Sequence, residues 1–547
     1  MTSSSTVQSR ALELTQRLVR VPSCSRTVQE REFAQYLHAL LAELGGGMLE
    51  VGLYPVPDDP WHRAVPWALL AGQGPRTVVL MSHYDTVDTA DYGALREWAT
   101  EPDVLREQMS VHASWYDPLT QEHLEHPEEW LFGRGVADMK SGIAAHLVAL
   151  EQFCERARTG GVLPGNVFFF CTPDEESESA GVLAAVHLLT ELRRERGLEF
   201  EGAINTDYTT ARFPGDEQKI VYTGTTGKLL PSLYVRGGET HAGEPYVGYD
   251  ANLLCAEVVR AISMRADLAD AAGDEVAAPP VTLKVTDFKD RYDVQVPFDA
   301  YAYLNYLTYS LLPSEVLELV SGIASEALSD AVRRTARQNR DWNERAGLPE
   351  PPAPASPQTI TYADLLGHAR ANYGEAAVRR HLEECNASLL VQEVDPRVRS
   401  ARLVRELWNL SGLRGPAVVL YYSPPYYPQV SASADTVFLR AVRAVAAEHE
   451  AQVKRFFPYI SDGSYMSLES VTDLEALTDN MPLWRETSDP SGYSLPLQMI
   501  RELGVDVANV GVWGFGAHKR EERLHIPYSC GTVPEMVMDV VTRTLSA

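Results

Sequence analysis

The segment TVVLMSHYDTV (residues 77–87) decides the expected fold, because a short apolar run ends there in polar residues that can carry chemistry. The run Thr77 to Met81 predicts a strand that is buried on both faces, as in a parallel sheet. His83 follows this strand, and a neutral imidazole is a good zinc ligand. Asp85 can accept the other ring N–H of His83 and so orient the ring. Taken alone, this pattern also fits a solvated turn after a strand.

Helix and strand patterns alternate outward from this segment. Short apolar runs predict further strands over residues 166–172, 203–206 and 507–513. Apolar residues spaced three and four apart predict helices over residues 28–44, 141–153, 180–195 and 436–452. The alternation predicts an α/β domain with a mostly parallel sheet and helices on both faces. Sites in such open sheets lie at the carboxyl ends of the strands.

Two acidic motifs fall near expected strand ends. In GRGVADMKSG (residues 133–142), Asp138 precedes a helix. It can be an N-cap, or it can bridge two metal ions that lie roughly 3.5–4 Å apart. In TPDEES (residues 172–177), Glu175 and Glu176 follow a buried strand. Carboxylates in that position need a cation to offset their desolvation, although an acidic helix start is the simpler alternative.

Two single residues complete the candidate set. Asp207 follows the expected strand 203–206, and His518 lies in the late segment GAHKREE (residues 516–522). Each is unremarkable alone, since a lone Asp is usually a turn residue and a lone His is usually structural. Together with the three motifs they form a mixed nitrogen and oxygen ligand list that suits zinc. His525 is a second candidate for the last histidine, but the Ala-His-x-x-x-Glu context favours His518.

The order of these motifs resembles the M20 family of co-catalytic metallopeptidases and deacylases over nearly the whole chain. The long inserted region and the segment FFPYISD (residues 456–462) look most like the arginine-utilisation (RocB-like) branch of that family. The resemblance implies two zinc ions per chain, with cobalt or manganese as alternatives. It implies five metal ligands: His83, Asp138, Glu176, Asp207 and His518. Asp138 would bridge both ions, Asp85 would orient His83, and Glu175 would be the general base.

An inserted α+β domain, expected over residues 223–429, resembles the lid of this family, which commonly also carries a dimer interface. The catalytic domain would then comprise residues 1–222 and 430–547. His241, in ETHAGEP (residues 239–245), matches a family histidine that stabilises the oxyanion, in dimers at the partner's site. Its simpler alternative is a turn residue. Smaller members of the family often have a lid arginine that binds the substrate carboxylate. No arginine follows the matching stretch, residues 294–299, so the residue that would bind the carboxylate here stays open.

The composition excludes several classes of function. The chain has 547 residues with 48 basic and 75 acidic side chains, a net charge of −27. So acidic a surface repels nucleic acid and anionic membranes. The six cysteines are scattered without a CxxC pair, as expected for free thiols in a reducing compartment. No run approaches the roughly 18 apolar residues of a membrane span, and the N-terminus predicts an amphipathic helix, so we expect a cytoplasmic protein.

These observations predict a metal-dependent hydrolase that cleaves an amide or peptide bond in a small substrate. A dipeptide or an N-acyl amino acid is the expected substrate, with arginine metabolism as the expected context and a homodimer as the expected assembly. The alternative from another class is a catalytically silent protein of the same fold that binds or scaffolds. Loss of a ligand or of Glu175 would favour that alternative, and none of these residues is missing.

Overall fold

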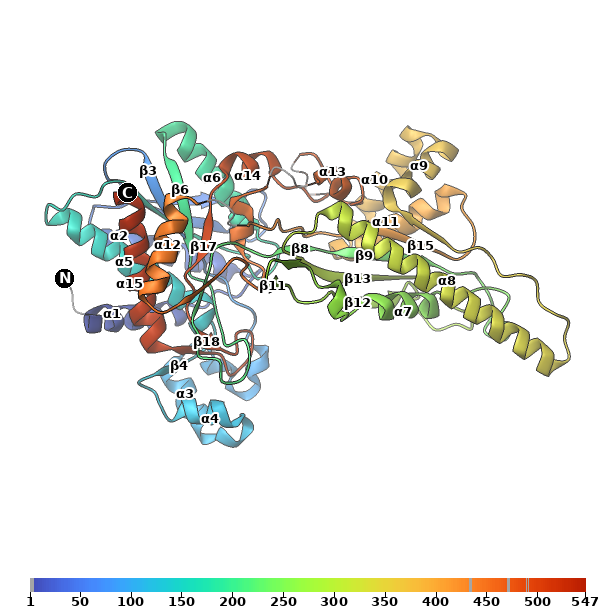
Figure 1. The fold of residues 1–547 in the computed structure, drawn as a ribbon, viewed down its shortest axis with the longest axis horizontal. Helices are drawn as coiled ribbons and strands as arrows, with labels where there is room; N and C mark the ends of the chain where they lie inside the picture. Colours follow the sequence, from blue (N-terminus) through green and yellow to red (C-terminus); the bar gives the residue numbers. More distant parts are fainter. Residues whose placement is uncertain (1–3, 432–434, 470–472, 488, 490) are drawn as a thin grey trace. The chain divides into compact units, whose positions relative to one another are not determined.

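The computed structural model describes all residues except 1–3, 432–434, 470–472, 488 and 490, and it divides the chain into two compact units (Figure 1). The first unit comprises Met1–Thr225, Val430–Leu468 and Pro496–Ala547. The second unit comprises Thr226–Gln429 and Glu469–Leu495. The expected boundaries near residues 222 and 430 lie close to these.

One part of the expected division needs correction, since residues 469–495 pack with the second unit and not with the catalytic domain. Asn480 explains the difference: its side chain accepts the Ala363 N–H at 3.1 Å, and its backbone carbonyl accepts the Tyr422 N–H at 2.7 Å. Asn386 adds a hydrogen bond to the Ser491 carbonyl at 2.6 Å. The chain therefore returns to the second unit after residue 468.

The first unit is built on an eight-stranded sheet with the order β1-β2-β5-β3-β6-β17-β7-β16. Its strands are β1 (Glu50–Pro55), β2 (Ala64–Leu70), β3 (Arg76–His83), β5 (Asn166–Thr172), β6 (Glu199–Asn205), β7 (Ile220–Tyr222), β16 (Gln452–Lys454) and β17 (Val507–Asn509). The pairs β5–β3, β3–β6, β6–β17 and β7–β16 are parallel, and the other three pairs are antiparallel. The sheet is thus mixed, with its parallel part at the centre.

Helices cover both faces of this sheet. Alternate side chains of β3 and β5, such as Val78 and Phe169, belong to the main core together with α1, α2, α5, α12 and α15. Helix α6 packs against β1, β2 and β5 with residues outside that core, and α14 packs on α6. The helices are α1 (Ser4–Val19), α2 (Val28–Gly45), α5 (Ser141–Arg158), α6 (Ala180–Arg196), α12 (Val437–Glu448), α14 (Leu497–Leu503) and α15 (Val533–Ser546).

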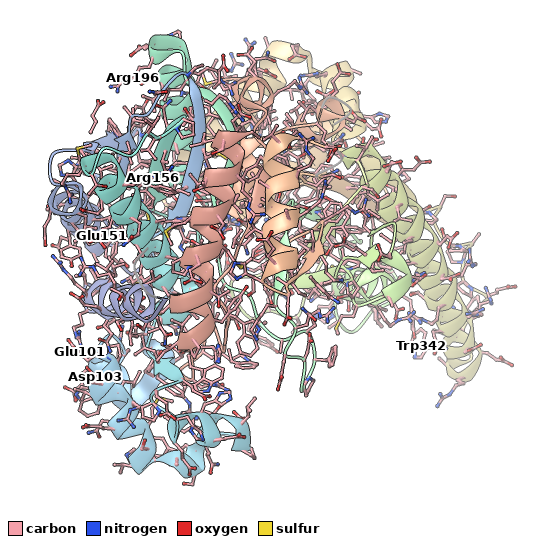
Figure 2. The ribbon with its side chains drawn as sticks, turned by 60° about the vertical axis from the view of Figure 1, so that its left-hand side comes forward. Glu101, Asp103, Glu151, Arg156, Arg196 and Trp342 are labelled. Carbon is pink, nitrogen blue, oxygen red and sulfur yellow. The ribbon has the colours of Figure 1, made fainter. Side chains whose placement is uncertain are left out.

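A smaller excursion of the first unit lies between β3 and α5. It contains α3 (Pro102–Val111), α4 (Pro118–Leu124) and β4 (Trp130–Phe132), which joins β18 (Gly514–Phe515) and β19 (Arg523–His525) in a small sheet (Figure 1). Glu101 and Asp103 lie close together at the surface (Figure 2) and pair with Arg20 at 3.2 and 2.8 Å. The excursion brings residues 130–138 beside residues 514–525.

The second unit is an α+β unit around a six-stranded sheet. Its strands are β8 (Gly227–Leu229), β9 (Pro231–Arg236), β12 (Val281–Asp287), β13 (Asp299–Thr308), β14 (Gln358–Thr361) and β15 (Ala417–Tyr422), with the two-residue strands β10 (Ala271–Ala272) and β11 (Glu275–Val276) apart from them. Its helices are α7 (Ala251–Ile262), α8 (Pro313–Ala346), α9 (Tyr362–Tyr373), α10 (Glu375–Val391), α11 (Pro396–Ser411) and α13 (Leu474–Thr478). Among the helices of the described residues, none is long and apolar enough to cross a membrane.

Candidate metal centre

Three neighbouring parallel strands place the candidate side chains at one edge of the sheet. His83 is the last residue of β3 and lies opposite Thr172, the last residue of β5. Glu175 and Glu176 follow β5, and Asp207 follows β6, which pairs with the other side of β3. The carboxyl ends of parallel strands meet at one edge, so residues far apart in the chain become neighbours there.

Five of these side chains form two groups that share Asp138. In the first group, His83 Nε2 lies 3.1 Å from Asp138 Oδ1 and 4.0 Å from Asp207 Oδ1. In the second group, His518 Nε2 lies 3.2 Å from Asp138 Oδ2 and 2.9 Å from Glu176 Oε1. The candidate ligand atoms within each group lie within 4.8 Å of one another. Asp138 therefore offers one carboxylate oxygen to each group, as a bridging ligand would.

The donor set fits two divalent metal ions. Each group offers one imidazole nitrogen and carboxylate oxygens from two residues, a combination typical of zinc and other first-row metals. The carboxylates of Asp138, Glu176 and Asp207 are largely buried, with side-chain exposures of 13%, 7% and 7%. Buried anions in contact with each other are costly without a cation to receive them. The residues thus fit a pair of metal ions, which would supply the missing positive charge.

The pKa values of the cluster residues are shifted by burial and by the charges of their neighbours. Burial, and then the negative charge of Asp138, raise the pKa of both Glu176 and Asp207 to about 7. Burial also raises the pKa of Glu175 well above its ordinary value, with a further rise from Asp207. For His518, hydrogen bonds to Asp138 and Glu176 raise the pKa to about 11. Each shift shows a carboxylate or imidazole responding to a cluster with excess negative charge.

Asp85 stabilises the turn that carries Glu175 and Glu176. The Asp85 carboxylate accepts the backbone N–H of Glu175 at 3.0 Å and that of Glu176 at 3.2 Å. His83 Nδ1 lies 3.1 Å from the Asp85 carbonyl oxygen and 3.5 Å from its Oδ1. Asp85 thus contacts the ring it was predicted to orient, but its carboxylate makes shorter contacts with the turn.

A buried ion network holds the start of the same turn. Asp174 has a φ of 67°, in the left-handed region that costs a non-glycine residue energy. Its carboxylate pairs with Arg63 at 2.7 Å, and its backbone N–H donates to Glu30 at 3.0 Å. Arg63 also pairs with Asp59 and Glu30. The network fixes the backbone that presents the next two glutamates.

Of the two candidate histidines near the C-terminus, His518 is the one that joins the cluster. Its side chain is 49% exposed and comes from a residue with a φ of 64°. His525 instead lies edge-on to Trp130 and Trp513, and burial lowers its pKa to about 4. His518 therefore occupies the solvent-facing side of the cluster, where a substrate can approach.

Most of the chain is similar to a known protein family. The profile of peptidase family M20/M25/M40 matches residues 79–478. This chain belongs to that family. Protein RocB of Bacillus subtilis (strain 168) is 31% identical over 554 residues, covering 98% of this chain and 95% of RocB. The uncharacterized protein YqjN of the same organism is 32% identical over 544 residues, covering 98% and 96%. The chain is therefore an M20-type metallohydrolase with RocB-like relatives.

Solved structures agree on the fold. Aminopeptidase PepT from Bacillus cereus ATCC 10987 superimposes with a TM-score of 0.55 at 12% identity, covering 98% of each chain. The YxeP protein of Bacillus subtilis, described as a dinuclear metal-binding peptidase from the M20 family, has a TM-score of 0.51 at 11% identity over all of both chains. The predicted α/β fold class is confirmed.

Asp462 is a buried carboxylate at the end of β5 that the sequence did not single out as chemical. Its side chain is buried, and its Oδ2 accepts the Thr172 hydroxyl at 2.6 Å. Oδ1 has no hydrogen-bond partner within the described part of the chain. Burial raises the pKa of Asp462 to about 7, and its charge contributes to the raised pKa of Glu175. The segment 456–462 carried a family signal, but no ligand-type spacing marked this Asp.

His241 belongs to the second unit, whereas the residues of the cluster belong to the first. It is exposed, and its Nδ1 accepts the Gly243 N–H at 3.0 Å. In a neutral ring this leaves the proton on Nε2, which can donate to an anion. The predicted oxyanion role of His241 stays a prediction.

Proposed function

We propose that this M20 hydrolase cleaves an amide or peptide bond in a dipeptide or an N-acyl amino acid, with two zinc ions and with Glu175 as general base. The observation that carries the proposal is the position of Asp138, whose two oxygens face the histidines of two ligand groups. His83 and Asp207 would complete the first metal site, and Glu176 and His518 the second.

Bound metal ions would supply Lewis acidity here, which would polarise the substrate carbonyl and lower the pKa of water toward neutrality. The Glu175 carboxylate takes a proton from the attacking water and returns it to the nitrogen of the leaving amine. Its buried position beside Asp207 and Asp462, which raises its pKa, suits a group that must hold that proton between the two steps. Asp85 keeps Glu175 in place through the backbone of the turn.

Two tyrosines stack beside a candidate metal ligand, since Tyr208 directly follows Asp207. The rings of Tyr208 and Tyr459 stack with centroids 6.3 Å apart, and Tyr459 is 45% exposed. Burial raises the pKa of Tyr459, and the charges of Asp138 and Asp207 raise it further. We propose arginine derivatives as the first substrates to screen, on the resemblance to the arginine-utilisation branch.

Two further parts of the proposal rest on the family resemblance. His241 would donate from Nε2 to the oxyanion, in a homodimer at the partner's site. The proposed compartment is the cytoplasm, which is supported by six unpaired cysteines.

The proposal is tested by metal content and turnover together. Protein purified without chelator is analysed by elemental mass spectrometry and screened against N-acyl amino acids and dipeptides. We expect about two zinc ions per chain. Glu175→Gln should retain the metal and lose about 10²–10⁴-fold in kcat, because only the general base is removed.

Glu178→Gln is the matched control, since Glu178 lies in the same turn but pairs with Arg26 at 3.1 Å. It should keep near-normal turnover. A folded protein that takes up no metal when zinc, cobalt or manganese is supplied would contradict the proposal. That result would favour a silent binding or scaffolding protein.

A further inference from the structure

The buried carboxylate of Glu522 is hydrogen-bonded to the backbone of Asp138, the candidate bridging ligand. Glu522 is 1% exposed, and its Oε1 accepts the backbone N–H of Ala137 at 3.1 Å and that of Asp138 at 3.3 Å. The carbonyl oxygen of Glu522 also accepts the Gly133 N–H at 3.2 Å. Three hydrogen bonds therefore join Glu522 to the loop that presents Asp138.

A buried arginine balances the charge of this carboxylate. Arg134 Nη1 donates to Glu522 Oε2 at 2.8 Å, and Nη2 donates to both oxygens of Asp91 at 2.9 Å. The guanidinium also lies 5.2 Å from the centre of the Tyr92 ring. Arg134 is 1% exposed, whereas the Asp91 side chain is 35% exposed. The chain of charges Asp91–Arg134–Glu522 thus runs from the surface to the Asp138 loop.

Glu522 also belongs to the turn that presents His518. Within this turn the Lys519 N–H donates to the Gly516 carbonyl at 2.9 Å, and the Glu522 N–H donates to the Lys519 carbonyl at 3.0 Å. The 3.2 Å separation of His518 Nε2 and Asp138 Oδ2 spans two loops that are far apart in sequence. The Glu522 side chain, from the turn that carries His518, is hydrogen-bonded to the loop that carries Asp138.

We propose that Glu522, held by Arg134, is a positioning residue that sets the Asp138 carboxylate at the distance from His518 that two metal ions require. The inference rests on the proposed metal site and deepens it. Among the described residues, no hydrogen bond joins Glu522 to a candidate ligand atom, and its carboxylate is bonded to the backbone of Ala137 and Asp138 instead. By accepting the backbone N–H groups of Ala137 and Asp138, Glu522 restrains the backbone that carries the Asp138 side chain. Partners that orient metal ligands in this way affect metal affinity.

Cobalt titration of chelator-stripped, full-length protein tests this role. The visible absorption of bound Co²⁺ reports affinity and ligand arrangement without any turnover. Glu522→Gln keeps the size of the side chain but turns an amide N–H₂ or an uncharged oxygen toward Arg134. We expect the dissociation constant for Co²⁺ to rise by about 10–100-fold and the absorption band to change, as for other partners that orient metal ligands.

Two variants frame the result. Glu521→Gln changes the neighbouring carboxylate of the same turn and should leave the titration unchanged. Asp91→Asn weakens the far end of the chain of charges and should shift the Co²⁺ affinity in the same direction by less. Circular dichroism of each stripped variant shows whether it is folded.

Each outcome decides something. A wild-type protein that binds no Co²⁺ contradicts the proposed metal site itself. Normal binding by wild type with an identical affinity and band in folded Glu522→Gln overturns the positioning role and leaves Glu522 a structural residue. If Glu522→Gln does not fold, Asp91→Asn decides, and an unchanged titration in that variant overturns the inference.

Discussion

At the scale of single residues, Asp138 is the only side chain that belongs to both candidate ligand groups among the described residues. Asp138→Asn should therefore reduce the metal content from about two ions per chain to nearly none. His518→Asn should leave about one ion, because His83, Asp138 and Asp207 remain. Elemental mass spectrometry after gel filtration measures both variants.

The matched control for this prediction is Asp88→Asn. The Asp88 side chain is 55% exposed and pairs with Arg96 at 3.0 Å, so the substitution makes the same charge change away from the cluster. It should keep the full metal content. Two ions retained in Asp138→Asn would show that the carboxylate does not bridge.

The sequence predicted the members of the cluster better than the residues that support it. His83, Asp138, Glu175, Glu176 and Asp207 follow strands or precede helices, so their positions at the sheet edge could be anticipated. Asp462 and Glu522 reach the cluster from late segments through hydrogen bonds to Thr172 and to backbone amides. Glu522 is the glutamate of the Ala-His-x-x-x-Glu context that favoured His518, but that spacing did not reveal its contact with the Asp138 loop, and no spacing marked Asp462.

At the scale of elements, local pattern predicted the buried core well and the ends poorly. The strand at residues 166–172 and the helix starts at Val28, Ser141 and Ala180 are confirmed. The last strand was wrong in length, since β17 spans only Val507–Asn509 and not residues 507–513. Val512 and Trp513 are buried as an apolar run requires, but Trp513 pairs with Thr209 through an isolated bridge and not in a ladder.

Helix α5 carries a buried histidine that makes stability depend on pH. His146 is fully buried with its Nδ1 3.0 Å from Ser82 Oγ, and burial lowers its pKa to about 3. Between about pH 6.5 and 3 the unfolded chain binds a proton there that the folded chain does not. The contribution of His146 to the free energy of unfolding should therefore fall as the pH falls through this range, by about 1.4 kcal/mol per pH unit.

The prediction is checked by urea unfolding of chelator-stripped protein at pH 7 and pH 5. From pH 7 to pH 5 the unfolding free energy of His146→Gln should rise by about 2 kcal/mol relative to that of the wild type, because the variant has no imidazole to protonate when the chain unfolds. His187→Gln, on helix α6, is the control and should behave like the wild type. An equal change in unfolding free energy between pH 7 and pH 5 in all three proteins would mean that His146 titrates normally in the folded state.

At the scale of the whole molecule, the insertion could be predicted from sequence but its return crossing could not. The insertion expected over residues 223–429 lies close to the main segment of the second unit, Thr226–Gln429. Residues 469–495 instead join the second unit through single side chains such as Asn480 and Asn386. Those contacts have no periodicity, so hydropathy and helix patterns do not reveal them.

The metal cluster should also govern the stability of the first unit, in a way that depends on pH. In stripped protein, burial and Asp138 raise the pKa of Glu176 and Asp207 to about 7, from about 4.3 and 3.9 in the unfolded chain. A raised carboxyl pKa stabilises the folded state fully below the unfolded pKa. That stabilisation is lost as the pH rises through about 7. The stripped protein should therefore become less stable from pH 5.5 to pH 8, when both carboxylates ionise beside Asp138.

Metal binding reverses this trend, because deprotonated carboxylates bind metal ions best and a ligand that binds only the folded state stabilises it. Calorimetry of zinc-loaded and stripped protein should show a difference in unfolding free energy that widens from pH 5.5 to pH 8, on the order of 2–4 kcal/mol. The His146 contribution is common to both forms and cancels in this comparison. Asp138→Asn provides the control, since its loaded and stripped samples should unfold alike at both pH values. A difference for the wild type that stays constant with pH would show that the clustered carboxylates are not the groups that zinc neutralises.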